Sequence, residues 1–281
     1  MKVATQISSV TEEVRAWKDS GLSIGLVPTM GALHDGHKSL IERCRKENDK
    51  VIVSVFVNPI QFGPNEDFEQ YPRPFEKDKE ICEALGADLV FHPDPSEMYQ
   101  DLRTFVTIEG LTDNLCGVSR PTHFRGVCTV VSKLFNITKA ERAYFGQKDA
   151  QQLAIIRKMV KDLNFDVEIK GCPIVRESDG LAKSSRNKYL NEEERKAALC
   201  LSKSLKLAME SISPGMKASE LIDIIRSEIE KEPLSRIDYA SCVDALTMED
   251  VETIDRDVLI AIAVYIGKTR LIDNFSYEIK E

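Results

Sequence analysis

The chain has 281 residues, of which 42% are hydrophobic and 30% charged, and this balance is typical of a globular protein that buries a sizeable core. Its net charge of −8 argues against a general nucleic-acid binder, because no basic excess is present to neutralise a phosphate backbone. No apolar run reaches the ~18 residues of a membrane span, and the start of the chain lacks the apolar stretch of a signal peptide, so we expect a cytoplasmic protein with no nucleic-acid or membrane partner.

Apolar β-branched runs alternate with amphipathic segments as far as residue 170. Strands are predicted at 22–27, 51–57, 88–91, 143–145 and 167–169, with helices at 36–47, 75–85, 124–136 and 150–163. This alternation predicts an α/β fold, a Rossmann-like doubly wound parallel sheet with helices on both faces. Ligands of such sheets bind beyond the carboxyl ends of the strands. Residues 58–74 are predicted to form a long polar loop, and 94–117 show no clear pattern.

The pattern changes after Asp179-Gly180, which predicts one domain at 1–180 and a smaller α+β domain at 181–281. Asn191 is a predicted N-cap, since three glutamates follow it in the first turn of a helix that should end near Met209. A helix at 218–230 and strands at 237–243, 258–265 and 270–274 complete this domain.

The seven cysteines are scattered, odd in number and without a Cys-x-x-Cys pair. This distribution disfavours both structural zinc and a disulfide framework. We expect buried free thiols in a reducing compartment, and none of them is expected to act as a nucleophile.

The most informative stretch is Pro28-Thr29-Met30-Gly31-Ala32-Leu33-His34-Asp35-Gly36-His37, which places two of the four histidines where a predicted strand turns into a helix. Unpaired N–H groups at a helix start suit a phosphate, and an imidazole can donate a hydrogen bond to a phosphate oxygen. The glycines let the backbone pass close to a ligand. A lone histidine would more often cap or pack, but this pairing favours a phosphate site.

The stretch resembles the His-x-Gly-His signature of the nucleotidylyltransferase superfamily. Further blocks follow in one order: Phe56–Gly63, Tyr71–Arg73, His123–Val127, Phe145–Asp149, Gln151–Leu153 and Ser184–Asn187. Together they resemble the pantothenate synthetase (pantoate–β-alanine ligase) family from residue 20 to residue 190. Three positions depart from the family pattern. They are Lys183, where the family usually has Met or Leu, Gln147, where it more often has Glu, and Ala150, where it more often has an aromatic residue.

The resemblance implies a set of site residues. The implied ATP-binding residues are Met30, Gly31, Ala32, Leu33, His34, Asp35, Gly36, His37, Gly146, Gln147, Lys148, Asp149, Val175, Lys183, Ser184, Ser185 and Arg186. Of these, His34, His37, Lys148 and Arg186 are the expected catalytic residues. The amides Asn58, Gln61 and Gln152 are expected to bind substrate, and Asp78 to lie near Mg²⁺, although its charged surroundings also fit a solvated helix face. No step of the reaction is assigned to His123 or Arg125.

The implied reaction is the ATP-dependent condensation of pantoate with β-alanine through a pantoyl adenylate, which releases AMP and pyrophosphate. The resemblance also implies a homodimer and Mg²⁺. The C-terminal domain is expected to close over ATP, because Ser184–Arg186 lie next to the change at Asp179-Gly180 and Gly180 can absorb backbone rotation. Two alternatives stay open, another small-molecule adenylyltransferase and a non-catalytic nucleotide-binding regulator. The neutral amides Gln61 and Gln152 favour a carboxylate acceptor, and the retained Lys148 argues against a regulator.

Overall fold

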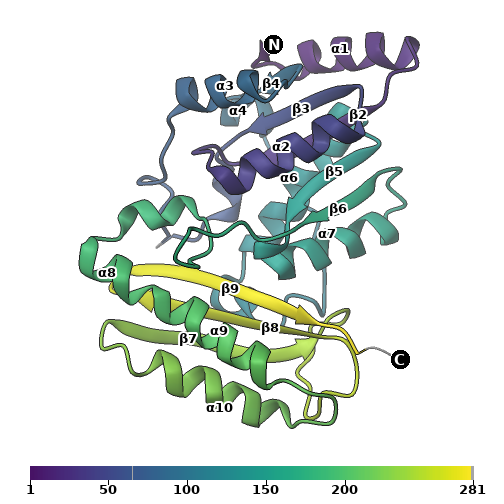
Figure 1. Cartoon of the computed structure of the whole chain (residues 1–281). Helices are drawn as coiled ribbons and strands as arrows, with labels where there is room; N and C mark the ends of the chain where they lie inside the picture. Colours follow the sequence, from purple (N-terminus) through teal and green to yellow (C-terminus); the bar gives the residue numbers. More distant parts are fainter. Residues whose placement is uncertain (65, 280–281) are drawn as a thin grey trace. The chain divides into compact units, whose positions relative to one another are not determined.

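A computed structural model describes residues 1–64 and 66–279 of the chain (Figure 1). By its internal contacts the chain forms two compact units, which are described separately. The first unit comprises Met1–Ile108, Arg120–Gln147 and Ile155–Pro173, and the second comprises Glu109–Ser119, Lys148–Ala154 and Ile174–Glu281. Residue 180, where the sequence predicts a domain boundary, lies within the second unit by this measure.

The first unit is built on a six-stranded parallel sheet with the order β1-β4-β3-β2-β5-β6. Its strands are β1 (Lys2–Ala4), β2 (Ile24–Thr29), β3 (Lys50–Val55), β4 (Leu89–Phe91), β5 (Arg142–Gly146) and β6 (Glu168–Cys172). The order reverses between β2 and β5, as in the doubly wound Rossmann-like folds predicted from the sequence. Ligands of such sheets bind at that reversal, where the loops after β2 and β5 begin.

Helices pack against this sheet. Helix α2 (Asp35–Glu47) contacts β2, β3 and β5, and helix α6 (His123–Thr138) contacts β2 and helix α1 (Ile7–Asp19). The remaining elements are α3 (Phe75–Ala84), α4 (Pro95–Met98) and the 3₁₀ turn η1 (Pro59–Gln61). The 3₁₀ turn η2 (Gln147–Asp149) and helix α7 (Ala150–Asp162) are shared, because Lys148–Ala154 belong to the second unit. Every residue of β3 after Lys50 is buried, as expected for a central strand between two helical layers.

The predicted strands and helices of this unit are confirmed, with ends that differ by a few residues. Helix α1 and strand β1 have no counterpart in the sequence prediction. Helix α1 buries Val10 and Val14, which lie one turn apart. With Ile7 and Trp17 they form a helical repeat that could have been found from the sequence.

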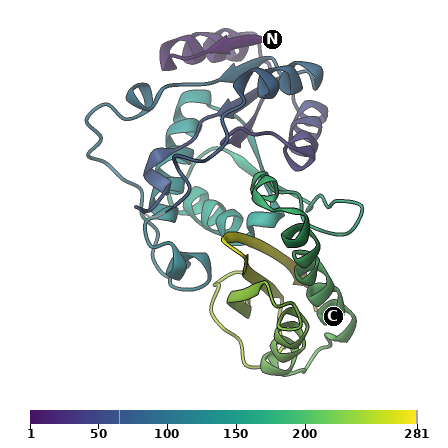
Figure 2. The ribbon, with the colours of Figure 1, turned by 90° about the vertical axis from the view of Figure 1, so that its left-hand side faces the viewer.

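The second unit contains a three-stranded antiparallel sheet of β7 (Ser235–Asp244), β8 (Val258–Ile266) and β9 (Thr269–Tyr277). Its helices are α5 (Cys116–Ser119), α8 (Glu192–Ala197), α9 (Leu199–Ser211) and α10 (Ala218–Ile229). Helices α9 and α10 lie side by side, as Figure 1 and Figure 2 show, and their apolar side chains share one core with β8. The predicted α+β character of this part is confirmed.

Asn191 is the N-cap of α8, as predicted. Its Oδ1 accepts a hydrogen bond from Glu194 N at 2.9 Å, and its own N–H donates to Glu194 Oε2 at 2.9 Å. The single helix predicted beyond this cap is divided at Ala198. The chain stays helical there but tightens, with a bond from Leu201 N to Ala198 O at 3.2 Å.

Gln151 ties the segment Glu109–Ser119 to the start of α7. Its side chain is 6% exposed and makes three hydrogen bonds, donating to Leu111 O and Asn114 O and accepting from Cys116 N. These distances are 2.8–2.9 Å, so both the oxygen and the NH₂ group of this amide are hydrogen-bonded. The segment falls in the unclear region of the sequence, where periodicity gave no prediction.

All seven cysteines are buried, as expected. Burial raises the pKa of Cys44, Cys82, Cys128 and Cys200 to about 12. In the part of the chain that the structure describes, no helix is both long and apolar enough to cross a membrane.

Candidate active site

The loop after β2 turns through an unusual backbone conformation. Gly31 and Ala32 have φ angles of 78° and 51°, in the left-handed region. Glycine adopts this region readily, whereas alanine is strained in it. Gly31 N donates to Thr29 Oγ1 at 3.1 Å, and Thr29 Oγ1 in turn donates to Ser54 O at 2.8 Å. Backbone strain of this kind is common at functional sites, so the turn is a candidate binding element.

His34 and His37 cap helix α2 reciprocally. His34 is the N-cap, and its Nδ1 accepts from Gly36 N at 3.1 Å, while His37 Nδ1 accepts from His34 N at 3.3 Å. The ring centroids are 4.1 Å apart. Because each Nδ1 accepts a hydrogen bond, the proton of each neutral ring is assigned to Nε2.

This cap corrects one part of the sequence interpretation. The backbone N–H groups of His34 and Gly36 are bonded to imidazole nitrogens and are not open for a phosphate. The donor that each ring can offer a phosphate oxygen is therefore its Nε2–H.

Asp78 lies on α3 and contacts the same loop. Its Oδ2 accepts from Ala32 N and its Oδ1 from Leu33 N, both at 2.8 Å, and the residue is 1% exposed. The sequence suggested a solvated helix face or a metal site for this carboxylate. Its burial contradicts the solvated helix face, and the structure gives the carboxylate two backbone hydrogen bonds inside the protein.

Asn58 and Gln61 lie in one hydrogen-bonded group after β3. Asn58 Nδ2 donates to Gln61 Oε1 at 2.9 Å and to Gly126 O at 3.1 Å, and its Oδ1 accepts from the Tyr99 hydroxyl at 2.7 Å. Burial raises the pKa of Tyr99, so this hydroxyl keeps its proton for the bond. Gln61 Nε2 lies 3.0 Å from Met30 Sδ. Two of the three predicted substrate amides thus lie together, beside a residue of the histidine loop.

His123, to which the sequence assigned no reaction step, contacts the backbone of Gln61. Its Nδ1 lies 3.0 Å from Gln61 O, and its Nε2 lies 3.1 Å from Arg120 Nη1. A guanidinium can only donate, so Nε2 accepts and the Nδ1–H donates to the carbonyl. The proton of His123 is therefore on the opposite nitrogen from that of His34 and His37. Sequence reasoning missed Tyr99, which lies 41 positions from Asn58, and Arg120, which also donates to Glu66 Oε2 54 positions away.

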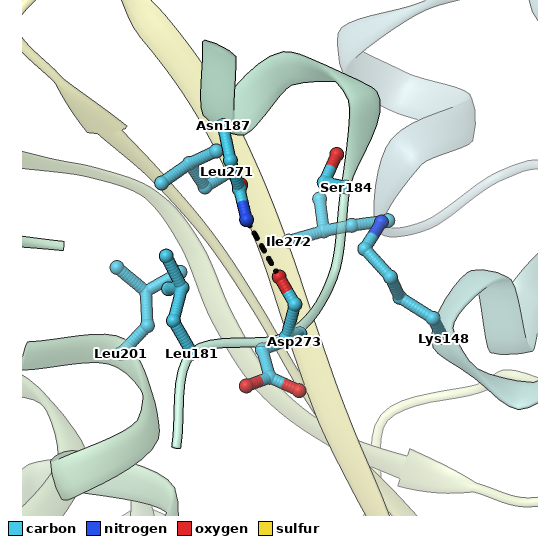
Figure 3. A pocket seen from close by; sticks show the side chains of 9 residues that line it. Lys148, Leu181, Ser184, Asn187, Leu201, Leu271, Ile272 and Asp273 are labelled. Atoms are coloured by element: carbon cyan, nitrogen blue, oxygen red, sulfur yellow. Dashed lines mark hydrogen bonds between the residues drawn. The ribbon is translucent and has the colours of Figure 1, made fainter. Parts of the chain in front are cut away.

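Lys148 lines a small pocket of the second unit, with a volume of about 10 Å³, the space of about one water molecule. The other lining residues are Leu181, Ala182, Ser184, Asn187, Leu201, Leu271, Ile272 and Asp273. Figure 3 shows the Lys148 side chain reaching toward Ser184. The backbone of Lys148 is fixed to β9, because its carbonyl accepts from Asn274 Nδ2 at 2.8 Å. Lys148 and Ser184, two predicted phosphate-binding residues, thus lie in one pocket.

The loop at 183–187 is shaped by its own side chains. Ser184 caps η3 (Ser185–Tyr189), and its Oγ accepts from Arg186 N at 3.3 Å. Asn187 Nδ2 donates to Ala182 O at 3.0 Å, the dashed bond in Figure 3. Asn187 Oδ1 is buried and has no hydrogen-bond partner among the described residues. A buried acceptor of this kind is uncommon, which makes the loop a candidate ligand contact.

Lys183 has an acidic neighbour. Its Nζ pairs with Glu177 at 2.6 Å, and its backbone N–H donates to Val175 O at 2.9 Å. Arg176 forms a bidentate pair with Asp273 of β9, at 2.6 and 3.0 Å, and donates to Gly180 O at 3.1 Å. This pair braces the approach to the 183–187 loop. Sequence reasoning missed it because its members are 97 positions apart.

The remaining predicted residues follow β5. Gly146 ends the strand and Gln147 begins η2, both in the first unit. Asp149 and the half-buried Gln152 belong to the second unit. The structure therefore groups His34, His37, Asn58 and Gln61 in the first unit, and Lys148, Gln152 and Ser184–Arg186 in the second.

No protein-built metal cage is evident. Among the described residues, no three His, Cys, Asp or Glu side chains gather in a way that could hold a metal ion. Asp78, the predicted metal contact, already uses both carboxylate oxygens for backbone N–H groups.

Comparison with known proteins matches residues 2–276 to the family described as pantoate-beta-alanine ligase. The chain is 64% identical over 278 residues to the pantothenate synthetase of Clostridium novyi, covering 98% of each sequence.

Two solved structures are similar over the whole fold. The pantothenate synthetase of Thermus thermophilus superposes with a TM-score of 0.91 at 41% identity, over 98% of this chain and 99% of that one. The pantoate-beta-alanine ligase of Francisella tularensis, solved in complex with beta-gamma ATP and beta-alanine, superposes with a TM-score of 0.81 at 36% identity, over 98% and 97% of the two chains.

Proposed function

Because the chain belongs to the pantoate–β-alanine ligase family, we propose that it condenses pantoate with β-alanine in two steps that use ATP. The pantoate carboxylate attacks the α-phosphorus of ATP, and pyrophosphate leaves. The β-alanine amine then attacks the carbonyl carbon of pantoyl adenylate, AMP leaves with the electrons of the broken C–O bond, and the nitrogen loses a proton. The products are pantothenate, AMP and pyrophosphate.

The observation that carries this proposal is the reciprocal cap of His34 and His37. It fixes both rings beside the loop after β2 and assigns the proton of each neutral ring to Nε2. Two neutral donors stabilise negative charge on a phosphate without the cost of burying further charge. The first step needs such donors because it brings a carboxylate to a polyphosphate, and two anions repel each other.

The second unit supplies the charged donors in this proposal. Lys148 acts on the α-phosphate, where negative charge grows as the carboxylate attacks. Ser184, Ser185 and Arg186 bind the β- and γ-phosphates, and the guanidinium can hold two oxygens at once. The shared pocket of Lys148 and Ser184 supports this division.

The amides Asn58, Gln61 and Gln152 bind oxygens of pantoate in this proposal. Neutral amides recognise a hydroxyl and a carboxylate without lowering the reactivity of the carboxylate by a strong ion pair. The bonds from Tyr99 to Asn58 and from His123 to Gln61 support preorganised positions for two of them.

Mg²⁺ belongs to the proposal as the ion that accompanies ATP. Its chemistry is to neutralise phosphate charge and assist departure of pyrophosphate. We assign its ligands chiefly to phosphate oxygens and water, the usual arrangement for this ion. The two backbone bonds of Asp78 do not support the metal contact predicted for it.

We also propose a cytoplasmic homodimer in which residues 181–281 act as a lid over ATP. The family resemblance supports the dimer, the position of Ser184–Arg186 close to Gly180 supports the lid, and the biosynthetic role supports the compartment.

Pyrophosphate release tests the function. With ATP, Mg²⁺ and pantoate alone, the enzyme should release one stoichiometric burst and then stop, because pantoyl adenylate stays bound. Addition of β-alanine should convert the burst into continuous release with equal amounts of AMP. Another adenylyltransferase would show no burst with pantoate, and a regulator would bind ATP without releasing pyrophosphate under either condition.

A further inference from the structure

The turn that leads into the histidine pair needs an external restraint. Ala32 has a φ of 51° and follows Gly31 at 78°. A non-glycine residue in this region is strained and persists only where surrounding contacts determine it. Without such contacts the turn would relax, and His34 two residues later would move with it.

Asp78 supplies contacts at this turn. One carboxylate oxygen accepts from Ala32 N and the other from Leu33 N, each at 2.8 Å. A carboxylate with two backbone N–H donors forms a charge-assisted, bidentate clamp on two consecutive residues. The clamp is inside the protein, where water does not compete, because Asp78 is 1% exposed.

The fit at Gly31 shows how close the clamp is. A Cβ at this position would lie 2.9 Å from Asp78 Oδ2 and 3.2 Å from Val55 Cγ1. The carboxylate therefore fills the space beside Gly31, and the turn and the carboxylate fix each other's position.

We propose that Asp78 is a positioning residue that fixes the Gly31–Leu33 turn, and through it the two imidazoles, for the first half-reaction, and that it is not a ligand of Mg²⁺. This inference depends on the proposed function for its kinetic consequences. The clamp itself is a property of the protein without substrates.

The main test compares Asp78→Asn with Glu76→Gln. Both variants remove one negative charge from the first turn of α3, but the Glu76 side chain is 82% exposed and pairs with Lys79 at 3.7 Å. An asparagine keeps the size of Asp78 but presents an NH₂ group to one of the two backbone N–H donors. Single-turnover formation of pantoyl adenylate is measured over a range of Mg²⁺ concentrations.

We expect Asp78→Asn to lower the rate at saturating Mg²⁺ by roughly 10²-fold, the effect of a small misplacement of catalytic groups. The Mg²⁺ concentration for half the maximal rate should stay that of the parent, and Glu76→Gln should match the parent throughout. If extra Mg²⁺ restored the rate of Asp78→Asn, the residue would be a metal ligand and the proposal would be wrong. A parent-like rate at all Mg²⁺ concentrations would also overturn it.

Ala32→Gly provides a rescue that a merely structural role would not give. Glycine takes a φ of 51° without strain, so the turn needs less restraint. Added to Asp78→Asn, Ala32→Gly should recover at least about tenfold of the lost rate. Absence of any recovery would contradict the restraint of a strained turn.

Hydrogen exchange keeps the inference testable apart from the reaction. In the parent without ligands, the amides of Ala32 and Leu33 should be protected, and Asp78→Asn but not Glu76→Gln should remove that protection. If Asp78→Asn lost this protection but the parent formed no pantoyl adenylate, the proposed function would be refuted and the clamp would still be supported. Unchanged protection would refute the clamp whatever the activity.

If Asp78→Asn does not fold, Gly31→Ala gives the second variant. It leaves the Asp78 charge in place and displaces the turn with a Cβ 2.9 Å from Oδ2. We expect the same loss of rate at unchanged Mg²⁺ dependence, and a parent-like rate would overturn the proposal.

Discussion

Gly126→Ala should displace a substrate-binding amide by a predictable amount. Gly126 lies on α6 against η1, where an added Cβ would be 2.5 Å from Gln61 Cα, 2.5 Å from Ile60 O and 2.6 Å from Gln61 N. All three are backbone atoms, so no side-chain rotation relieves the clash. Normal carbon contacts begin at about 3.5 Å, and the helix and η1 must therefore separate by about 1 Å.

This separation has two costs. Overpacking of this kind destabilises a fold by about 1–3 kcal/mol. The shift also stretches the bonds from Asn58 Nδ2 to Gly126 O and from His123 to Gln61 O, which hold the pantoate amides. A 1 Å misplacement costs roughly 10²-fold in rate, equivalent to about 2.7 kcal/mol of transition-state stabilisation.

Steady-state kinetics with varied pantoate and varied ATP, together with thermal unfolding, measure both effects. We expect kcat/KM for pantoate to fall far more than KM for ATP rises. Gly63→Ala is the matched control, because the nearest atoms to its Cβ are those of the flexible Glu66 side chain, beginning at 3.3 Å. If Gly126→Ala matched the parent in kinetics and stability, the packing argument would be refuted.

Three further predictions concern other groups. His34→Asn and His34→Ala should both slow adenylate formation by about 10²–10³-fold. Only the alanine variant should also lose about 1 kcal/mol of folding stability, because asparagine still caps α2. A normal rate in His34→Asn would exclude a role for the Nε2–H. Lys148→Ala should slow the first half-reaction but not the conversion of supplied pantoyl adenylate, and equal loss in both would contradict its assignment. Burial raises the pKa of the Cys128 thiol from 9.0 to about 12, so the free energy of unfolding, measured with urea, should fall as pH rises between these values. Cys128→Ala should reduce the slope of unfolding free energy against pH by up to about 1.4 kcal/mol per pH unit. An unchanged slope would refute the linkage.

The sequence predicted the sheet of the first unit because its central strands carry nearly continuous apolar residues. Val51–Val55 is such a run and forms β3. Helix α1 was not predicted, although Val10 and Val14 are both buried and have a helical spacing. The division at Ala198 was not predictable, because no glycine or proline marks it.

The sequence identified the histidine pair but not how it is fixed. Which ring nitrogen accepts a hydrogen bond depends on backbone geometry, and no residue pattern encodes it. The contacts of Asp78 with Ala32 and of His123 with Gln61 join positions 46 and 62 residues apart. Local periodicity carries no information on such pairs, so their roles emerge only from the fold.

The interleaving of the two units has a consequence for biosynthesis. Two segments of the second unit, Glu109–Ser119 and Lys148–Ala154, are translated before Ile174. Their packing partners in β7 and β9 are translated last. Cys116, for example, lies 3.2 Å from the Tyr239 hydroxyl and within 3.7 Å of the Arg270 guanidinium. As the chain leaves the ribosome, its amino-terminal part can form a sheet early while these two segments wait for the carboxyl-terminal strands. A nascent chain stalled before β9 would therefore expose them, and no single cut of the gene separates this enzyme into two self-sufficient pieces.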